Sequence, residues 1–174
     1  MHNNTGSLFG GGGVYARIPL VKKLSLQPEL LFSSEGTGYK KWRTDEESQR
    51  RFSSRDTLSL HYINLPVMLE YEFVKGLRGE FGPQFGFLVR AKNKWWSRYD
   101  RYGKGSENVK DSFKTFDFGL NFGLNYEARI GNGSADFGVR YNLGLTDIAE
   151  NFDSEEGKVR NRVFTIGMGI GYTF

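Results

Sequence analysis

Cysteine is absent from the sequence, which excludes disulfide bonds and metal sites built on thiolates. Histidine occurs only twice, as His2 and His61, so little material is available for a histidine-centred catalytic site. No apolar run approaches the roughly 18 residues that a membrane-spanning helix needs. The first residues also lack the apolar segment of a secretory signal peptide. We therefore expect residue 1 to correspond to an internal position of the natural gene product.

Charge of one sign is not concentrated anywhere in the chain. The 24 Lys and Arg residues and the 20 Asp and Glu residues are interspersed and leave a net charge of +4. This pattern favours a solvated surface over a nucleic-acid partner. Glycine and aromatic residues, by contrast, are abundant, with 23 glycines and an aromatic content of 16%. The mean hydropathy is nevertheless only −0.52, because only 38% of the residues are hydrophobic.

Strict two-residue alternation dominates the sequence and is clearest over residues 77–92. One phase runs from Leu77 to Ala91 without a charge, whereas the other phase includes Arg78 and Glu80. A helix would repeat its apolar stripe every three to four residues, so this pattern predicts a β-strand. The same alternation, with no charge in the apolar phase, occurs in six further segments: 8–18, 24–32, 63–73, 116–130, 135–145 and 164–174.

The connections between these segments alternate between short turns and long loops. The short connections are residues 19–23, 74–76 and 131–134, the last with the turn signal Gly-Asn-Gly-Ser. The long, charge-rich connections are residues 36–56, 93–112 and 146–162. Short turns at one end and long polar loops at the other are typical of bacterial outer-membrane barrels. The sequence therefore predicts an all-β, antiparallel, up-and-down transmembrane barrel that forms a single domain over residues 1–174.

Alternation alone does not decide whether the apolar phase faces lipid or a protein core. A soluble, lipocalin-like barrel would place the apolar residues inside and the charges outside. Three features favour the opposite arrangement. Most strand glycines share the charged phase, where small residues relieve crowding in a narrow barrel, and the charges of that phase are nearly balanced, as buried ion pairs require. Aromatic residues gather near both ends of the apolar phase, like the interfacial girdles of membrane barrels.

The charged phase should therefore line a lumen, where each charge needs a partner. Lys92 and Asp136 share this phase. The residues that we expect to form a lumenal ion-pair network are Arg17, Glu29, Glu70, Glu72, Arg78, Glu80, Arg90, Asp117, Glu127, Arg129 and Arg140. On the apolar phase, Leu120, Phe122 and Leu124 should face lipid at mid-membrane.

Six stretches, spread over nearly the whole chain, occur in an order that matches one known family. They are Ser25-Leu-Gln-Pro-Glu-Leu-Leu-Phe-Ser33, Ile63-Asn-Leu-Pro-Val67, Gly82-Pro-Gln-Phe-Gly86, Phe116-Asp-Phe-Gly-Leu120, Arg140-Tyr-Asn-Leu-Gly-Leu-Thr-Asp147 and Asn161-Arg-Val-Phe164. These stretches resemble the PorT-like outer-membrane β-barrel proteins of Bacteroidetes. The resemblance implies a location in the bacterial outer membrane, surrounded by lipid and lipopolysaccharide. It also implies an accessory role in type IX protein secretion, the process to which the namesake of the family is tied.

The last strand adds two further expectations. Gly169, Tyr172 and the terminal Phe174 resemble the C-terminal β-signal that the barrel assembly machinery reads, which makes that machinery an expected partner during biogenesis. Only seven strands are countable, whereas bacterial single-chain barrels have even numbers and the family resemblance implies eight. The strand from Leu8 and the last strand run in the same direction, so direct closure would be parallel. We therefore expect an upstream strand and signal peptide in the natural gene, and an open or distorted seam here.

Nothing in the sequence indicates an enzyme, a cofactor or a metal. His61 shares the apolar phase and should lie at the outer rim, where a lone histidine is more often structural than catalytic. The carboxylates of the charged phase have arginines in the same phase, which favours salt bridges over acid–base chemistry. The long loops offer a candidate surface for a protein partner or lipopolysaccharide phosphates, with these residues: Arg50, Arg51, Trp95, Trp96 and Tyr99. We predict a structural or interaction protein with a closed lumen. The alternatives are a narrow channel and a soluble ligand-binding barrel.

Overall fold

The computed structural model describes residues 3–5, 10–44, 51–97, 104–148 and 160–172. None of the helices in this part of the chain is long and apolar enough to cross a membrane. The elements are β1 (Asn3–Thr5), β2 (Gly11–Tyr15), β3 (Ile18–Val21), β4 (Leu24–Thr44), β5 (Arg51–Val74), β6 (Leu77–Ser97), β7 (Lys104–Asn108), the 3₁₀ turn η1 (Lys110–Ser112), β8 (Phe116–Ile130), β9 (Gly133–Gly144) and β10 (Arg162–Tyr172).

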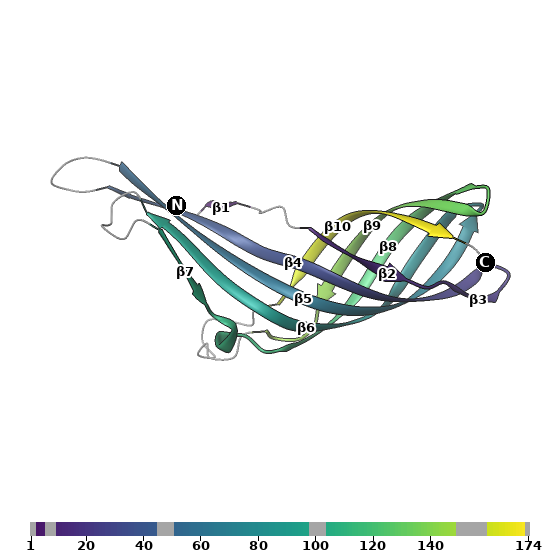
Figure 1. Cartoon of the computed structure of the whole chain (residues 1–174), viewed down its shortest axis with the longest axis horizontal. Coiled ribbons are helices and arrows are strands. Elements are labelled where there is room, and N and C mark those ends of the chain that lie inside the picture. Colours follow the sequence, from purple (N-terminus) through teal and green to yellow (C-terminus); the bar gives the residue numbers. More distant parts are fainter. Residues whose placement is uncertain (1–2, 6–9, 45–50, 98–103, 149–159, 173–174) are drawn as a thin grey trace.

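The strands form one strongly curled antiparallel sheet, a half-barrel whose long strands lie side by side in chain order (Figure 1). β1, β2 and β3 are successive pieces of the first strand, and all three pair with β4. From there the order is β4-β5-β6-β8-β9-β10, and the short β7 pairs with the outer part of β6. The predicted all-β, up-and-down arrangement of seven long strands is confirmed.

The apolar phase faces outward. On β8, Phe122 is 45% exposed and Leu124 is 51% exposed, whereas Glu127 of the other phase is buried. Leu120 is half-buried between its neighbours on β6 and β9 but remains on the outer face. Because residues of the two phases alternate along every long strand, the sheet has an apolar outer face and a polar inner one.

Cross-strand aromatic pairs reinforce the outer face between β6 and β8. Directly opposed rings form three pairs, with centroid separations of 5.1, 5.4 and 5.7 Å: Phe81–Phe122, Phe85–Phe118 and Phe87–Phe116. Such pairs of directly opposed side chains are the unit that stabilises a sheet.

A proline interrupts the pairing of the first strand. Between the last residue of β2, Tyr15, and the first residue of β3, Ile18, the chain passes Pro28 of β4. Pro28 has no N–H to donate, although its carbonyl oxygen still accepts a hydrogen bond from the backbone N–H of Ala16 at 3.1 Å. Arg17 therefore lies in a gap of the ladder.

Two of the predicted loops are largely strand. β4 continues to Thr44 and β5 begins at Arg51, so much of the predicted loop 36–56 is a hairpin that extends the sheet. β6 likewise runs to Ser97 and pairs with β7 inside the predicted loop 93–112. Strand pairing uses backbone groups and does not require apolar side chains, so these polar extensions lack the alternation that marks the other strands. They project from the half-barrel at its long-loop end (Figure 1).

A β-bulge in β6 changes which phase faces inward. His61 of β5 opposes Arg90, whereas the adjacent Tyr62 opposes Leu88, so Val89 is an extra residue. Val89 and Arg90 are both exposed, while Ala91 is fully buried. The prediction that Arg90 lies in the lumen is therefore wrong, because the alternation shifts by one residue at this bulge.

The half-barrel has an open seam in the part of the chain that the structure describes. No backbone pairing joins β10 to β2 or β3 there, and the outward side chains of β10 are very exposed, with Met168 at 85% and Ile170 at 90%. A side chain crosses the seam instead, since the Tyr15 hydroxyl donates a hydrogen bond to Asp136 Oδ2 of β9 at 2.8 Å. The open seam agrees with the strand-parity argument, and the upstream strand itself stays a prediction.

Candidate functional site

The candidate site is the interior of the half-barrel, and Arg140 of β9 lies at the centre of its first cluster. The guanidinium donates two hydrogen bonds of 2.8 Å to Glu29 of β4 and two, of 2.7 and 2.9 Å, to Glu80 of β6. Both carboxylates are buried, and Gln27 donates a further hydrogen bond of 2.9 Å to Glu29. Because β5, β6 and β8 separate β4 from β9 in the sheet, Arg140 joins opposite walls of the interior.

A glycine makes room for this cluster. Gly123 of β8 is opposed by Glu80 on one side and by Arg140 on the other. A Cβ at this position would overlap the Glu80 carboxylate and lie 2.8 Å from the carbonyl oxygen of Val139. The glycine in the charged phase is therefore required by crowding inside the barrel, as the sequence pattern indicated.

The second cluster lies toward the short turns and is organised by Arg17. Its Nε donates a hydrogen bond of 2.7 Å to Glu70 of β5, its Nη1 pairs with Glu127 of β8, and its Nη2 lies 3.6 Å from Asp136 of β9. Glu70 is fully buried. A side chain from the interrupted first strand thus contacts three other strands across the lumen.

Glu127 is the shared acceptor of this second cluster. Besides Arg17, it accepts hydrogen bonds from Arg78 at 2.8 Å and from Arg129 at 2.7 Å. Arg78 is buried, whereas the Arg129 side chain is 71% exposed near the edge formed by the short turns. Several cations around one carboxylate compensate for the cost of its burial.

Neutral polar side chains fill the interior beyond the Arg140 cluster. Asn121 is fully buried and its Nδ2 donates a hydrogen bond of 2.9 Å to Gln84, while Asn142 Nδ2 donates one of 2.9 Å to Asn121 Oδ1. The Met68 sulfur lies 3.8 Å from the Asn121 amide nitrogen. Met68 is itself 0% exposed, so side chains fill the interior around Asn121 and Met68.

A hydrogen-bonded triad follows toward the long loops. The Asn161 amide, just before β10, donates to Asp117 Oδ2 at 2.7 Å and to the Tyr62 hydroxyl at 3.3 Å. Asp117 therefore has a neutral partner and no ion pair within the described residues.

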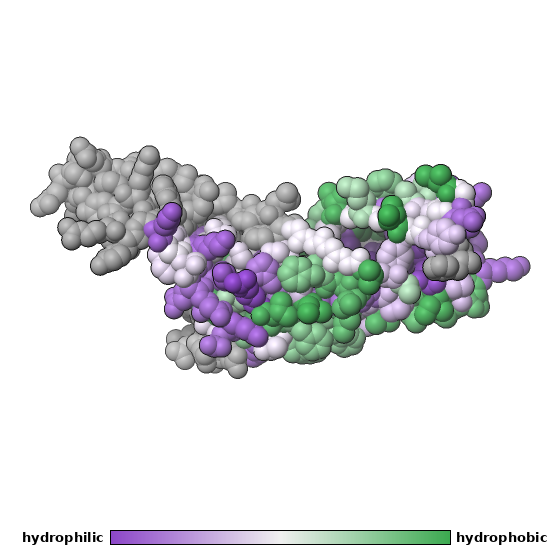
Figure 2. Space-filling model, viewed as in Figure 1, coloured by the Kyte–Doolittle hydropathy of each residue, from purple (hydrophilic) through white to green (hydrophobic). Residues whose placement is uncertain are grey.

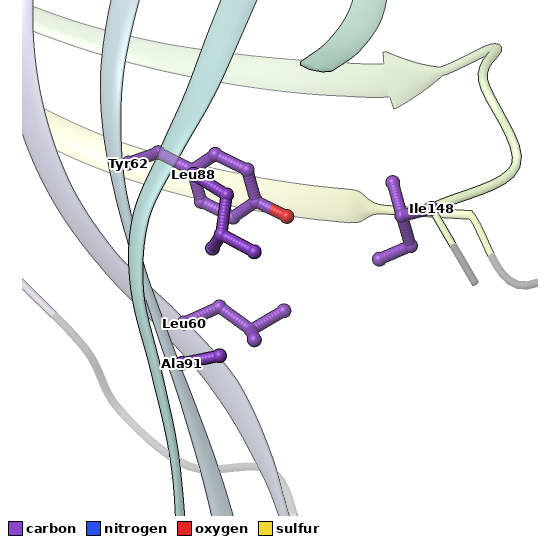
Figure 3. Packing of buried hydrophobic residues seen from close by; sticks show 5 residues of the cluster. All are labelled: Leu60, Tyr62, Leu88, Ala91 and Ile148. Atoms are coloured by element: carbon purple, nitrogen blue, oxygen red, sulfur yellow. The ribbon is translucent and has the colours of Figure 1, made fainter. Parts of the chain in front are cut away.

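The inner face of the sheet extension carries an apolar cluster, beside the Glu35 carboxylate that opposes Leu60 across β4 and β5. Figure 3 shows its five buried members converging from the strands and from the segment after β9: Leu60, Tyr62, Leu88, Ala91 and Ile148. Val109 and Phe113, from either side of η1, pack against them. The connecting segments are held here by backbone hydrogen bonds from Lys114 N to Ile148 O at 2.8 Å and from Val109 N to Ala91 O at 3.1 Å. The long-loop end of the lumen is thus covered by apolar side chains.

An apolar exterior around a self-paired polar interior is the arrangement that a protein needs when lipid surrounds it. Comparison with protein families agrees, since residues 5–150 match the family described as outer membrane protein beta-barrel domain. The chain belongs to this family. Comparison with curated proteins and with solved structures found no match. The protein is therefore located in the bacterial outer membrane, its apolar phase faces lipid, and the soluble lipocalin-like alternative is wrong.

Within this outer-membrane barrel, most residues of the predicted lumenal network are joined in ion pairs. The paired members are Arg17, Glu29, Glu70, Arg78, Glu80, Glu127, Arg129 and Arg140. Glu72 instead accepts a hydrogen bond of 2.9 Å from the backbone N–H of Gly76 in the β5–β6 turn. Among the described residues, neither Glu72 nor the outward-facing Arg90 has an ion pair.

Sequence reasoning missed several members of this interior. Asp136 shares the charged phase but was not included among the paired residues, and Tyr15 lies in the same phase two residues before Arg17. Their position in the charged phase of the alternation was the sequence signal that could have identified both residues as part of the interior. Ile148 carries no such signal, because it lies in a connection and joins the cluster through tertiary packing alone.

The remaining candidate residues lie at the outer face or at the ends. His61 stacks on Phe32, with ring centroids 5.9 Å apart, on the apolar phase as expected. Trp95 is partly exposed and lies opposite Gly105 of β7. Gly169 and Tyr172 belong to β10. Outside the described positions are Arg50, Tyr99 and Phe174, and the side chains of Arg51 and Trp96. The described residues hold no group of three or more His, Asp or Glu side chains placed to bind a metal ion.

Proposed function

We propose that this barrel is a structural or interaction protein whose lumen is closed to solutes. The observation that carries the proposal is the position of Arg140, which joins β4, β6 and β9 through four hydrogen bonds to Glu29 and Glu80. Each of these side chains would be costly to bury alone, so the cluster is stable only when all three are together. Side chains, rather than water, then occupy the centre of the interior.

Two further layers support a closed lumen over the narrow channel. Asn121 and Met68 are fully buried beside the Arg140 cluster, and the Leu60–Leu88–Ile148 packing covers the end that faces the long loops. A conducting path needs a continuous column of water along the axis. Such a path would have to displace ion pairs, a buried amide network and an apolar cluster in succession.

Single-channel recording in planar bilayers tests this proposal. The purified protein, shown by vesicle flotation to be inserted, should give no discrete conductance steps above the lipid baseline. A known pore-forming barrel, reconstituted in parallel, shows that the assay detects a channel. Reproducible steps from the inserted protein would establish the narrow channel and reject the closed lumen.

The same proposal includes no catalytic role. Glu29, Glu70, Glu80 and Glu127 each accept a hydrogen bond from an arginine, so each carboxylate has a structural partner and none is positioned as half of a proton donor and acceptor pair. The ends of the barrel are then the surfaces through which it acts. Interaction through the long loops, and recognition of Gly169, Tyr172 and Phe174 by the assembly machinery, belong to this proposal.

A placement among the PorT-like proteins, with an accessory role in type IX secretion, is the second candidate. It is supported by the six matching stretches, which run from Ser25 to Phe164 in the order of that family. Deletion of the gene from its natural host should then reduce secretion of type IX cargo, while other outer-membrane proteins stay at their normal levels. Unchanged cargo secretion in the deletion strain would reject this role and leave the closed-barrel proposal untouched.

A further inference from the structure

The β-bulge at Val89 changes the charge of the outer surface just beyond the apolar belt. Before the bulge, the outward residues of β6 include Phe87, and Leu88 points inward. After the bulge, the inward position is taken by Ala91, which is fully buried, and Arg90 is exposed on the outside. Since side chains alternate along a strand, Lys92 and Lys94 share the outer face with Arg90.

The neighbouring strands add a fourth cation and no opposing charge to this face. Directly opposed residues of paired strands share a face, so Lys104 of β7, which opposes Trp96, lies on the same side as Lys94. The residues of β5 that oppose the cations are His61, Ser59 and Thr57, and those of β7 are Asn108 and Ser106. None of these opposed residues, all within the described chain, is acidic. We call Arg90, Lys92, Lys94 and Lys104 the β6–β7 cationic stripe.

The stripe lies at the height where lipid headgroups meet the barrel. Arg90 follows directly after Val89, which is 42% exposed, and lies two strand positions beyond the Phe87–Phe116 ring pair. Aromatic side chains at the end of the apolar face mark the interfacial level of a membrane barrel. Figure 2 shows the same border, where hydrophilic surface over the β6–β7 extension directly adjoins the hydrophobic band. Long connections of bacterial barrels are extracellular, so this is the outer-leaflet side.

We propose that the β6–β7 cationic stripe binds the phosphate groups of a phosphorylated glycolipid of the outer leaflet, of the lipid A class. Lys and Arg side chains at this level keep their aliphatic stems against the apolar belt and place their charges among the headgroups. Phosphate oxygens accept charge-assisted hydrogen bonds from both residue types. The successive outward cations of one strand lie about 7 Å apart, since each residue rises about 3.4 Å. A ligand with several phosphates can therefore contact more than one of them.

Native mass spectrometry of the folded protein, with diphosphoryl lipid A titrated into the micelles, measures this binding. The triple variant Arg90→Gln, Lys92→Gln and Lys94→Gln should bind lipid A roughly a hundredfold more weakly, because each cation near an anionic lipid surface contributes about a factor of five. The matched control replaces three exposed cations at the short-turn end, Lys22→Gln, Lys23→Gln and Lys75→Gln, and should bind like the wild type. Dephosphorylated lipid A should bind wild-type protein as weakly as diphosphoryl lipid A binds the triple variant.

The proposal is overturned by undiminished binding of lipid A to the triple variant, by equal binding of dephosphorylated lipid A, or by loss of binding to the short-turn variant. Inorganic phosphate that binds wild-type protein as tightly as lipid A would show a free-anion site rather than a glycolipid site. If the triple variant does not fold, the single variants Lys92→Gln and Lys94→Gln, each on an exposed extension of the sheet, should each lose about fivefold. Unchanged binding by both would equally reject the stripe.

Discussion

The two halves of the lumen share strands β5 and β6 but are filled mainly by different kinds of side chain. Toward the short turns, the interior is ionic, with Arg17 and Arg140 each contacting carboxylates on several strands. Toward the long loops, Leu60, Leu88 and Ile148 form an apolar cluster. In the half that lipid surrounds, the walls curl around one another, so a long side chain can reach partners on the opposite wall. At the other end, connecting segments fold back and supply apolar cover.

The side chains of both halves are buried, although those of one half are charged and those of the other are apolar. An ionic interior is stable only while every charge keeps its partner, whereas an apolar interior loses stability in proportion to the volume removed. Substitutions that remove one charge should therefore be more damaging than substitutions that remove one apolar side chain. The predictions below use this difference, beginning with the largest expected effect.

Replacement of Arg140 by Met should lower the free energy of unfolding by about 3–5 kcal/mol, because Glu29 and Glu80 would be left buried without a cation. Urea-induced unfolding in lipid vesicles measures this loss. The matched variant combines Arg140→Met with Glu29→Gln and Glu80→Gln, which removes all three charges together. It should recover most of the lost stability, and a triple variant as unstable as the single one would contradict the ion-pair account.

Introduction of Arg at Leu120 tests the depth of this outward-facing position in the membrane. This position faces lipid at mid-membrane, where Arg costs about 2–4 kcal/mol of barrel stability. The control is Ile130→Arg on the same strand and the same face but at the short-turn edge, where the cost falls to about 0–1 kcal/mol. Unfolding in vesicles distinguishes the two variants, and equal losses at both positions would reject the depth that the structure assigns to Leu120.

Truncation of Ile148 to Ala tests the apolar half. The expected loss is about 2 kcal/mol, at the lower end of the range for such truncations, because the segment after β9 can relax into the cavity. The loss should not change with salt concentration, since no charge is involved. A stability equal to that of the wild type would show that this segment does not cover the lumen in solution.

Replacement of Tyr15 by Phe tests the seam and should have the smallest effect. The variant removes one hydrogen bond to Asp136, worth about 1 kcal/mol, while Arg17 still lies near the same carboxylate. The same unfolding assay applies, with Tyr141→Phe on the outer face as a control that removes a hydroxyl away from the seam. A loss as large as that of Arg140→Met would mean that the seam, rather than the Arg140 cluster, holds the half-barrel together.

Most of the fold could be predicted from the sequence, because alternation of period two identifies the strands and separates their two faces, and the glycines and balanced charges of one phase indicate which face is the interior. The same phase identified Arg140, Glu29 and Glu80 as interior residues, although it could not say which carboxylate each arginine contacts. Arg90 was misplaced because a single extra residue at Val89 leaves no mark in the pattern of polar and apolar residues. Ile148 was missed because its burial depends on packing between distant segments.

The central claim, that the lumen is closed, can be tested most directly at Met68, which lies on the inner face and is 0% exposed. The chain has no cysteine, so a single Met68→Cys variant reports its own accessibility to a water-soluble maleimide. A Lys75→Cys variant in the exposed β5–β6 turn provides the reference rate. We expect folded Met68→Cys to remain unlabelled while Lys75→Cys reacts fully, and to react only after unfolding in urea. Labelling of folded Met68→Cys at a rate near that of Lys75→Cys would contradict a closed lumen.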